Sequence, residues 1–428
     1  MHPFCKIGGM KYIMSKKTLA KLTVIQGAAE GLYTVKEAAR KLSLSERRIK
    51  QLKKAFREQG VKAVIHGNSA RHPANYTDEH MREHIVTLKK SALYEQTNFT
   101  HFNELLAERE NIQISYAALS SILKSAGITS KRKHRTEGRR FTSRRRRAAF
   151  GEMLQADATS YDWFGNGQRY ALHGFIDDAT GKITGLYFCK NECLMGYLEV
   201  LRQTLTEYGV PCELYADKAG IFNVNNKKEE HWTVEEMLAG KPLDKTQFGS
   251  IVEERLGITM LSAHTPQAKG RVERLWNTLQ DRLPVWFKLE GVTEIEQANI
   301  AIKQFISDYN TRFSVEPLKK ETAFLPLDDE NELDTLLSVR YERTTDNCGC
   351  FSFHNFMFQI DAKKPFAKKK ILFLFSQKLN FMALYDKCYY PVTCLGLKNN
   401  KKISHIPDVV KILMQKVYFA DGRKIQAA

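Results

Sequence analysis

A run of basic residues about a third of the way along the chain limits how the whole sequence can fold. Residues 131–147 read KRKHRTEGRRFTSRRRR, with ten lysines and arginines against one glutamate, a net charge of +9. Such a run repels itself and cannot enter a core, so it separates two folded parts of the chain. It carries half of the net charge of +18. A linker that follows a DNA phosphate backbone is the favoured interpretation, because neutralised phosphates release condensed counterions. A plain flexible tether is the alternative.

The rest of the composition is that of a folded protein with several domains. Hydrophobic residues make up 43% of the 428 residues, and this length predicts two to four domains. We expect no membrane partner, because no stretch approaches the roughly 20 apolar residues of a membrane span. The cysteines lack the spacing of zinc sites, so we interpret them as reduced thiols of a cytosolic protein. The nearest approach to a metal-binding cluster consists of Cys348, Cys350, His354, Cys388 and Cys394.

Residues 15–72, which follow a tail of residues 1–14, show three helical patterns with a tight turn before the third. This order predicts a helix-turn-helix DNA-binding domain. Thr34 and Glu37 have the spacing of a capping box at the start of the second helix. A solvated basic face on an ordinary three-helix bundle is the alternative. The outward face of the third helix, which suits a DNA groove, carries Arg47, Arg48, Lys50, Gln51 and Lys54.

Residues 73–130 predict a second helical domain, which is either another helix-turn-helix or a structural unit. Its last helix, 115–127, has a serine cap, a glycine stop and a buried stripe. The stripe consists of Tyr116, Leu119, Ile122 and Leu123. The basic linker then spans 131–149, and its candidate DNA contacts are Arg139, Arg140, Arg144, Arg145 and Arg146.

Residues 150–325 change to an α/β pattern that predicts an RNase H-like order: three adjacent strands, a helix, two more strands and a closing helix. A polar segment, 223–250, lacks strand character and is interpreted as a surface insertion. Residues 326–428 contain short aromatic and β-branched runs, among them 351–361, which predict a small β-barrel. The core strands are expected at 152–159, 169–177, 183–189, 213–217 and 258–263.

Three acids of the α/β region are predicted to converge. Asp157 and Asp217 each end an apolar strand, and Glu273 lies one turn into the helix of 264-HTPQAKGRVERLWNTLQDRL-283. Carboxylates at one edge of a sheet are the ligands that a pair of Mg²⁺ ions requires. We interpret Asp177 and Asp178 as acids of a hairpin turn. The other competing residues, with loop, cap or solvated roles, are Asp162, Glu253, Glu254 and His264.

The set LQADATSYDW, LYADKAG and TPQAKGRVERLWNTLQDRL resembles the catalytic core of DDE transposases and retroviral integrases. The family's Pro-Gln-x-x-Gly-x-x-Glu pattern is complete here and ends at Glu273. With its helix-turn-helix and C-terminal β region, the chain is similar to insertion-sequence transposases of the ISNCY-like group, and loosely to bacteriophage Mu transposase. The resemblance covers most of the chain to about residue 325. It departs from compact members in the wide spacing of Asp217 and Glu273, which the insertion explains.

This resemblance implies that Asp157, Asp217 and Glu273 are catalytic and bind two Mg²⁺ (or Mn²⁺) ions. It implies hydrolysis of DNA at the ends of a mobile element, followed by attack of the exposed 3′-hydroxyl on target DNA. The expected partners are double-stranded DNA and further copies of the chain, in the cytoplasm and nucleoid of a bacterium. Lys269 and Arg271 are expected to contact phosphates. The alternatives are a non-catalytic regulator derived from a transposase and an RNase H-type nuclease without strand transfer.

Overall fold

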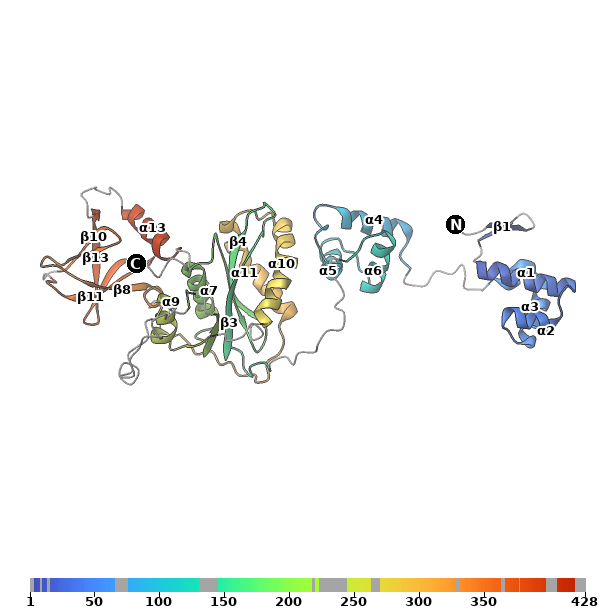
Figure 1. The fold of residues 1–428 in the computed structure, drawn as a ribbon, viewed down its shortest axis with the longest axis horizontal. Coiled ribbons are helices and arrows are strands. Elements are labelled where there is room, and N and C mark those ends of the chain that lie inside the picture. Colours follow the sequence, from blue (N-terminus) through green and yellow to red (C-terminus); the bar gives the residue numbers. More distant parts are fainter. Residues whose placement is uncertain are drawn as a thin grey trace, which may run out of the picture. The chain divides into compact units, whose positions relative to one another are not determined.

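The computed structural model describes most of the chain, and the basic linker and the insertion lie largely outside it. By contacts between residues the chain splits into two compact units, Met1–Ile85 and Val86–Ala428. Each unit is described by itself below (Figure 1). The described residues are 4–7, 10–13, 16–65, 76–130, 145–217, 220–222, 245–262, 270–327, 329, 332–362, 366–376, 378–397 and 406–419.

The first unit contains the predicted three helices. Thr34 caps the second helix and completes the capping box: its Oγ1 accepts from the Glu37 amide at 3.2 Å, and Glu37 Oε2 accepts from the Thr34 amide at 2.8 Å. Leu22, Ile25 and Ile49 are buried in the shared core. The tail of residues 1–14 contains a two-stranded hairpin. The elements are β1 (Phe4–Ile7), β2 (Met10–Ile13), α1 (Lys16–Glu30), α2 (Val35–Leu42), α3 (Glu46–Gln59) and η1 (Gly60–Val64).

Three further helices follow: α4 (Glu79–Lys90), α5 (Phe99–Arg109) and α6 (Tyr116–Ser125). The predicted stripe of α6 is buried except for Tyr116, which is exposed because it starts the helix beside its Ser115 cap. Arg282 and Arg312, from the core helices described below, pair with Glu104 of α5. The α5 helix therefore packs against the α/β core.

The core is a five-stranded mixed sheet whose strand order is β5-β4-β3-β6-β7. The first three strands along the chain are antiparallel neighbours, and β6 and β7 run parallel to β3. This agrees with the element order expected from the sequence. The strands are β3 (Met153–Tyr161), β4 (Tyr170–Asp177), β5 (Ile183–Cys189), β6 (Glu213–Ala216) and β7 (Thr259–Ser262).

Each face of this sheet is covered by its own helices, which explains why β4 and β5 are buried almost throughout. One buried cluster joins Leu154 and Ala156 of β3 to α7. A second cluster joins Leu172 and Leu186 to α10 and α11. The α10 and α11 helices lie together beside the sheet in Figure 1. The helices are α7 (Leu194–Glu207), α9 (Gln247–Gly249), η3 (Ser250–Arg255), α10 (Gly270–Glu290) and α11 (Ile295–Phe313).

The free edge of β5 is closed by side-chain amides. Asn310 donates to the Ile183 carbonyl at 2.9 Å and accepts from the amide of the same residue at 2.8 Å. Asn299 makes the same pair of bonds with Phe188, and Gln203 makes it with Leu186. An exposed edge strand invites pairing with another chain, and these amides occupy its hydrogen-bonding groups.

The C-terminal region is a six-stranded antiparallel sheet of order β8-β11-β12-β13-β10-β9. Its first and last strands contact each other, so the sheet is nearly barrel-shaped. The prediction of one strand over 351–361 is wrong. His354 and Asn355, with φ of 46° and 68°, form a tight turn that divides this run into two strands. The elements are α12 (Leu333–Leu336), β8 (Val339–Thr344), β9 (Cys350–Phe353), β10 (Phe356–Ile360), β11 (Lys370–Ser376), β12 (Asn380–Tyr385), β13 (Cys388–Leu397) and α13 (Ile406–Val417).

Candidate functional site

Asp157 lies in the middle of β3, half-buried and opposite Gly174 of β4. Its carboxylate has a fixed partner, because Nε1 of Trp276 donates to Oδ2 at 2.8 Å. Gly174 makes this contact possible. A Cβ added there would lie 2.8 Å from Cη2 of Trp276, so only glycine leaves room for the indole. The buried Trp276 therefore connects α10 to Asp157.

The α10 helix runs alongside β3 in a regular ladder of contacts. The Val272 amide donates to Gln155 Oε1 at 3.3 Å, and Gln280 Nε2 donates to Thr159 Oγ1 at 3.4 Å. Together with the bond from Trp276 to Asp157, these contacts join every second residue of the strand (155, 157, 159) to every fourth residue of the helix (272, 276, 280). Two strand residues span about 6.6 Å and four helical residues about 6.0 Å, so the two periods nearly match.

Glu273 is in the first turn of α10 and is exposed. It precedes Trp276 by three residues and Gln280 by seven, which places it on the helix stripe that faces β3. Residues 263–269, just before the helix, lie outside the described part of the chain, and with them Pro266, Gln267, His264 and Lys269. Within the described residues no three histidine, cysteine, aspartate or glutamate side chains are close enough to hold a metal ion. The arrangement is therefore an approach of helix and strand rather than a formed metal cluster.

Asp217 directly follows β6 and is half-buried. The parallel register of β3 and β6 pairs Met153 with Glu213 and Gln155 with Tyr215. Continued by two residues, the same register would bring Asp157 beside Asp217. Asp217 does follow the end of its strand, but Asp157 lies inside β3, which continues to Tyr161, so the prediction that both acids end their strands is wrong for Asp157.

Glu192, in the loop between β5 and α7, is an acid that sequence reasoning missed. The residue as a whole is exposed, but its carboxyl group accepts from Tyr197 Oη at 2.7 Å. Partial desolvation raises the pKa of Glu192, and the negative charges of Asp217 and Asp157 raise it further. Burial first, and then the same acids, raise the pKa of Tyr197 well above its ordinary value. A third carboxylate therefore shares the electrostatic environment of the predicted pair.

His173 supports this edge of the sheet from β4. Its Nε2 accepts from the Cys193 amide at 3.1 Å, and its Nδ1 lies 3.2 Å from the Tyr187 carbonyl. Since a carbonyl can only accept, Nδ1 carries the proton. The ring also packs edge-on against Tyr197. In the sequence this histidine is marked only by its place in the strand-like run of β4, and such a run cannot separate a supporting histidine from an apolar core residue.

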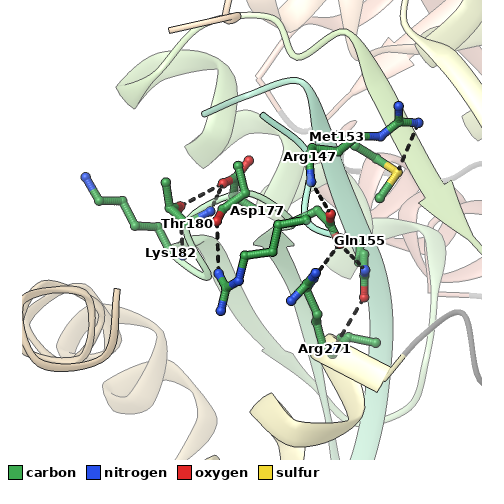
Figure 2. A network of polar contacts seen from close by, with 11 residues as sticks. Arg147, Met153, Gln155, Asp177, Thr180, Lys182 and Arg271 are labelled. Carbon is green, nitrogen blue, oxygen red and sulfur yellow. Dashed lines mark hydrogen bonds and ion pairs between the residues drawn. The ribbon is translucent and has the colours of Figure 1, made fainter. Parts of the chain in front are cut away.

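The predicted DNA contacts fall into three groups. Those of α3 are exposed, and Arg48 also donates to Gln51 at 3.2 Å. Arg145 and Arg146 are exposed, and Arg146 donates to the Ala179 carbonyl at 2.9 Å. Arg271 differs, because its side chain is only 13% exposed and its Nε donates to Asp178 Oδ1 at 2.6 Å. Figure 2 shows Arg271 pointing into a polar network with Gln155. The predicted contacts outside the described residues are Arg139, Arg140, Arg144 and Lys269.

The competing acids have structural partners. Asp162 accepts from the amides of Asn166 and Gly167 in its own loop. Asp177 accepts from the amide and hydroxyl of Thr180, as expected of a hairpin-turn acid. Glu253 and Glu254 form ion pairs with Lys245.

The cluster around Cys348 forms no metal site among the described residues. The chain's described helices also include none that is long and apolar enough to cross a membrane.

Comparisons with known proteins agree with this architecture. Residues 21–83 match the winged helix-turn helix family, a class of DNA-binding domain. The transposase for insertion sequence IS1202 of Streptococcus pneumoniae is 32% identical over 407 residues, 86% of this chain and 83% of that protein. The y4bF protein of Sinorhizobium fredii strain NGR234, named as a transposase, is 32% identical over 343 residues, 79% of this chain and 72% of that protein. The chain therefore belongs to the family of insertion-sequence transposases.

Solved structures show weaker similarity. The HTLV-2 integrase catalytic core domain in complex with magnesium (dimeric form) covers 36% of this chain and 83% of its own, with 16% identity and a TM-score of 0.25. A chain of the simian T-cell lymphotropic virus intasome in complex with PP2A regulatory subunit B56 gamma covers 73% of this chain and 97% of its own, with 14% identity and a TM-score of 0.29.

Proposed function

We propose that this transposase binds the terminal repeats of its insertion sequence and catalyses metal-dependent hydrolysis and strand transfer with an RNase H-like core. Asp157, Asp217 and Glu273 are its catalytic residues, and they hold two Mg²⁺ (or Mn²⁺) ions. The observation that carries the proposal is the shared register of Asp157 and Asp217 on parallel strands, with the Glu273 stripe of α10 alongside.

The donor set fits hard divalent cations. Every proposed ligand is a carboxylate, and oxygen is the ligand that Mg²⁺ prefers. Burial first, and then the charges of Asp217 and Asp157, raise the pKa of Glu192, so three acids share this edge in a chain of net charge +18. When bound, the ions activate the attacking oxygen and stabilise the leaving 3′-oxygen. Such an accumulation of acids is what cation binding relieves.

The chain's own groups orient this chemistry. The indole N–H of Trp276 donates to Oδ2 of Asp157 and so limits the orientation of this carboxylate. Glu273, one turn before Trp276 on α10, is proposed to reach the same edge. The exposed residues of α3 are proposed to read a DNA groove, and the basic linker to neutralise phosphates. Joining two element ends requires more than one active site, so we propose a homo-oligomer on DNA in the bacterial nucleoid.

The test uses the full chain, labelled terminal-repeat DNA and Mg²⁺ or Mn²⁺. We expect cleavage to fall at least ~100-fold in Asp157→Asn, Asp217→Asn and Glu273→Gln, with binding to the repeats retained. Asp162→Asn is the matched control, because this acid holds only its own loop. Equal cleavage by the three variants and the wild type would refute the site. Binding without cleavage by the wild type would favour a regulator derived from a transposase, and cleavage without joining would favour a nuclease.

A further inference from the structure

Asp178, which follows the last residue of β4, is completely buried. Its carboxylate accepts three hydrogen bonds from three separate segments: the Arg147 amide at 2.8 Å, Gln155 Nε2 at 2.9 Å and Arg271 Nε at 2.6 Å. Arg147 is the last arginine of the basic linker, Gln155 is in β3, and Arg271 is in the first turn of α10. Figure 2 shows Gln155 and Arg271 close together in this network, while the side chain of Arg147 points toward Met153.

The hairpin turn itself does not need this carboxylate. Asp177 already holds the turn, since it accepts from the Thr180 amide and hydroxyl, each at 2.7 Å, and from the Gly151 amide at 3.0 Å. A buried charge is costly unless it is paired and fully hydrogen-bonded. Burying Asp178 is therefore costly, and the turn does not require it, because the neighbouring Asp177 already stabilises the turn. The contacts of Asp178 therefore point to a role outside the turn.

That role lies at the start of α10. Gln155 uses both ends of its amide: Nε2 donates to Asp178, and Oε1 accepts from the Val272 amide at 3.3 Å. The first-turn amides of a helix have no partner within the helix. Arg271 and Val272 are thus both anchored, one by its side chain and one by its backbone. The next residue in the chain is Glu273.

We propose that Asp178 is a positioning residue: through Gln155 and Arg271 it sets the first turn of α10, and hence Glu273, in register with β3. Its bond to the Arg147 amide ties this register to the end of the basic linker. Arg147 is itself paired with Glu213 at the start of β6 at 2.5 Å. The network therefore connects the DNA-binding linker, two strands and the helix of the proposed catalytic glutamate. The functional part of the inference rests on the proposed role of Glu273.

Relocating the charge tests the network. Asp178→Asn removes an acceptor and is expected to speed hydrogen exchange in the first turn of α10 by ~10–100-fold, the usual effect of losing a bond to a charged group. The rest of α10, beyond residue 280, should change far less. Gln155→Glu alone places two buried carboxylates side by side and should be at least as damaging. Gln155→Glu with Asp178→Asn restores one buried carboxylate, which can accept from the Val272 amide and from the asparagine NH2, but one former donor of Asp178 then faces that NH2. We therefore expect partial recovery toward the wild-type exchange rate.

Asp177→Asn is the matched control, because it removes the neighbouring buried acid, which bonds Thr180 of the turn and the Gly151 amide. It should accelerate exchange in β4 and β5 without a preference for α10. For terminal-repeat cleavage we expect Asp178→Asn to lower kcat at least ~10-fold while the KM for DNA stays within about twofold, with recovery in the double variant. Unchanged exchange at residues 270–276 in Asp178→Asn, or no recovery in the double variant, would overturn the inference. If the wild type does not cleave at all, the proposed function fails while exchange still decides the positioning.

Discussion

The contact between Gly174 and Trp276 gives the sharpest quantitative prediction. In Gly174→Ala, the new Cβ would lie 2.8 Å from Cη2 of Trp276 and 2.7 Å from Cδ2 of Leu186. Carbon atoms ordinarily pack at about 3.5–4.0 Å, so the indole must move by about 0.7 Å or more. The 2.8 Å bond from Nε1 to Asp157 would then reach about 3.5 Å and no longer count as a hydrogen bond.

Two costs follow from this displacement. Overpacking a core costs about 1–3 kcal/mol, and a lost bond to a charged acceptor costs about 1.5–3 kcal/mol. Moving the indole relieves the overpacking but breaks the hydrogen bond, so the two costs do not add fully. We expect the free energy of opening this region to fall by about 3 kcal/mol. Measured by hydrogen exchange in peptides covering β3 and β4, this corresponds to roughly 100-fold faster opening. Gly270→Ala is the control: within the described residues its Cβ would meet nothing within 4 Å, and exchange should not accelerate.

A double-mutant cycle shows whether the indole is the cause. Trp276→Phe removes both Cη2 and the N–H donor, so in that background Gly174→Ala should cost only about 1 kcal/mol, through Leu186. The expected coupling between the two positions is therefore about 2 kcal/mol. Equal costs of Gly174→Ala in both backgrounds would refute the reasoning, because the added methyl group would then act on something other than Trp276.

Three further predictions concern other parts of the second unit, Val86–Ala428. Burial, and next the charge of Arg282, lower the pKa of His101 from 6.5 to about 4. The charge of Glu104 raises this pKa and that of Arg312 lowers it. As the pH falls, His101 therefore binds its proton in the unfolded chain before it does so in the folded chain. Stability should fall by about 2 kcal/mol between pH 7 and pH 5, seen as a falling unfolding midpoint that is absent in His101→Leu. Asn310→Ala should cost about 1–3 kcal/mol and speed exchange in β5, whereas Gln304→Ala, exposed on the same helix, should not. Glu192→Gln removes one acid from the site and should raise the Mg²⁺ concentration needed for half-maximal cleavage, with unchanged DNA binding; an unaltered requirement would exclude it from the site.

The sequence predicted elements whose cause is local and missed contacts between distant segments. Strand-like apolar runs predicted the strands of the core, and the spacing of Thr34 and Glu37 predicted a capping box, because both depend on residues a few positions apart. Asp178 could be predicted as a turn acid but not as a buried hub, since its partner Arg271 is 93 residues away. The hairpin at His354 was missed because aromatic residues continue on both sides of it in one run, and a histidine with positive φ is uncommon.

The site itself divides in the same way. Asp157 and Asp217 were singled out because each was expected to end an apolar strand. Asp217 does follow β6, whereas β3 continues beyond Asp157 to Tyr161, since strand ends are set by pairing with neighbouring strands and not by the apolar run alone. Glu192 was not predictable, because it lies in a loop without a motif. It is marked only by its bond to Tyr197 and by the nearby acids. Arg271 was predicted to face DNA from its charge alone, and its buried partner in β4's turn appears only in the folded structure.

The geometry of the ladder between α10 and β3 indicates where their register is set. Two strand residues advance about 6.6 Å and four helical residues about 6.0 Å, so each step away from the best-fitting contact adds about 0.6 Å of slip. The three contacts measure 3.3 Å at Gln155, 2.8 Å at Asp157 and 3.4 Å at Thr159. The shortest is the central one, and both outer contacts are longer, as slip in opposite directions from the centre requires. The helix is therefore registered on Asp157 itself. A shift of α10 by one residue would move it about 1.5 Å along β3, more than the roughly 0.6 Å mismatch at each outer contact. The contact between Trp276 and Asp157 therefore fixes the position of Glu273 along the strand.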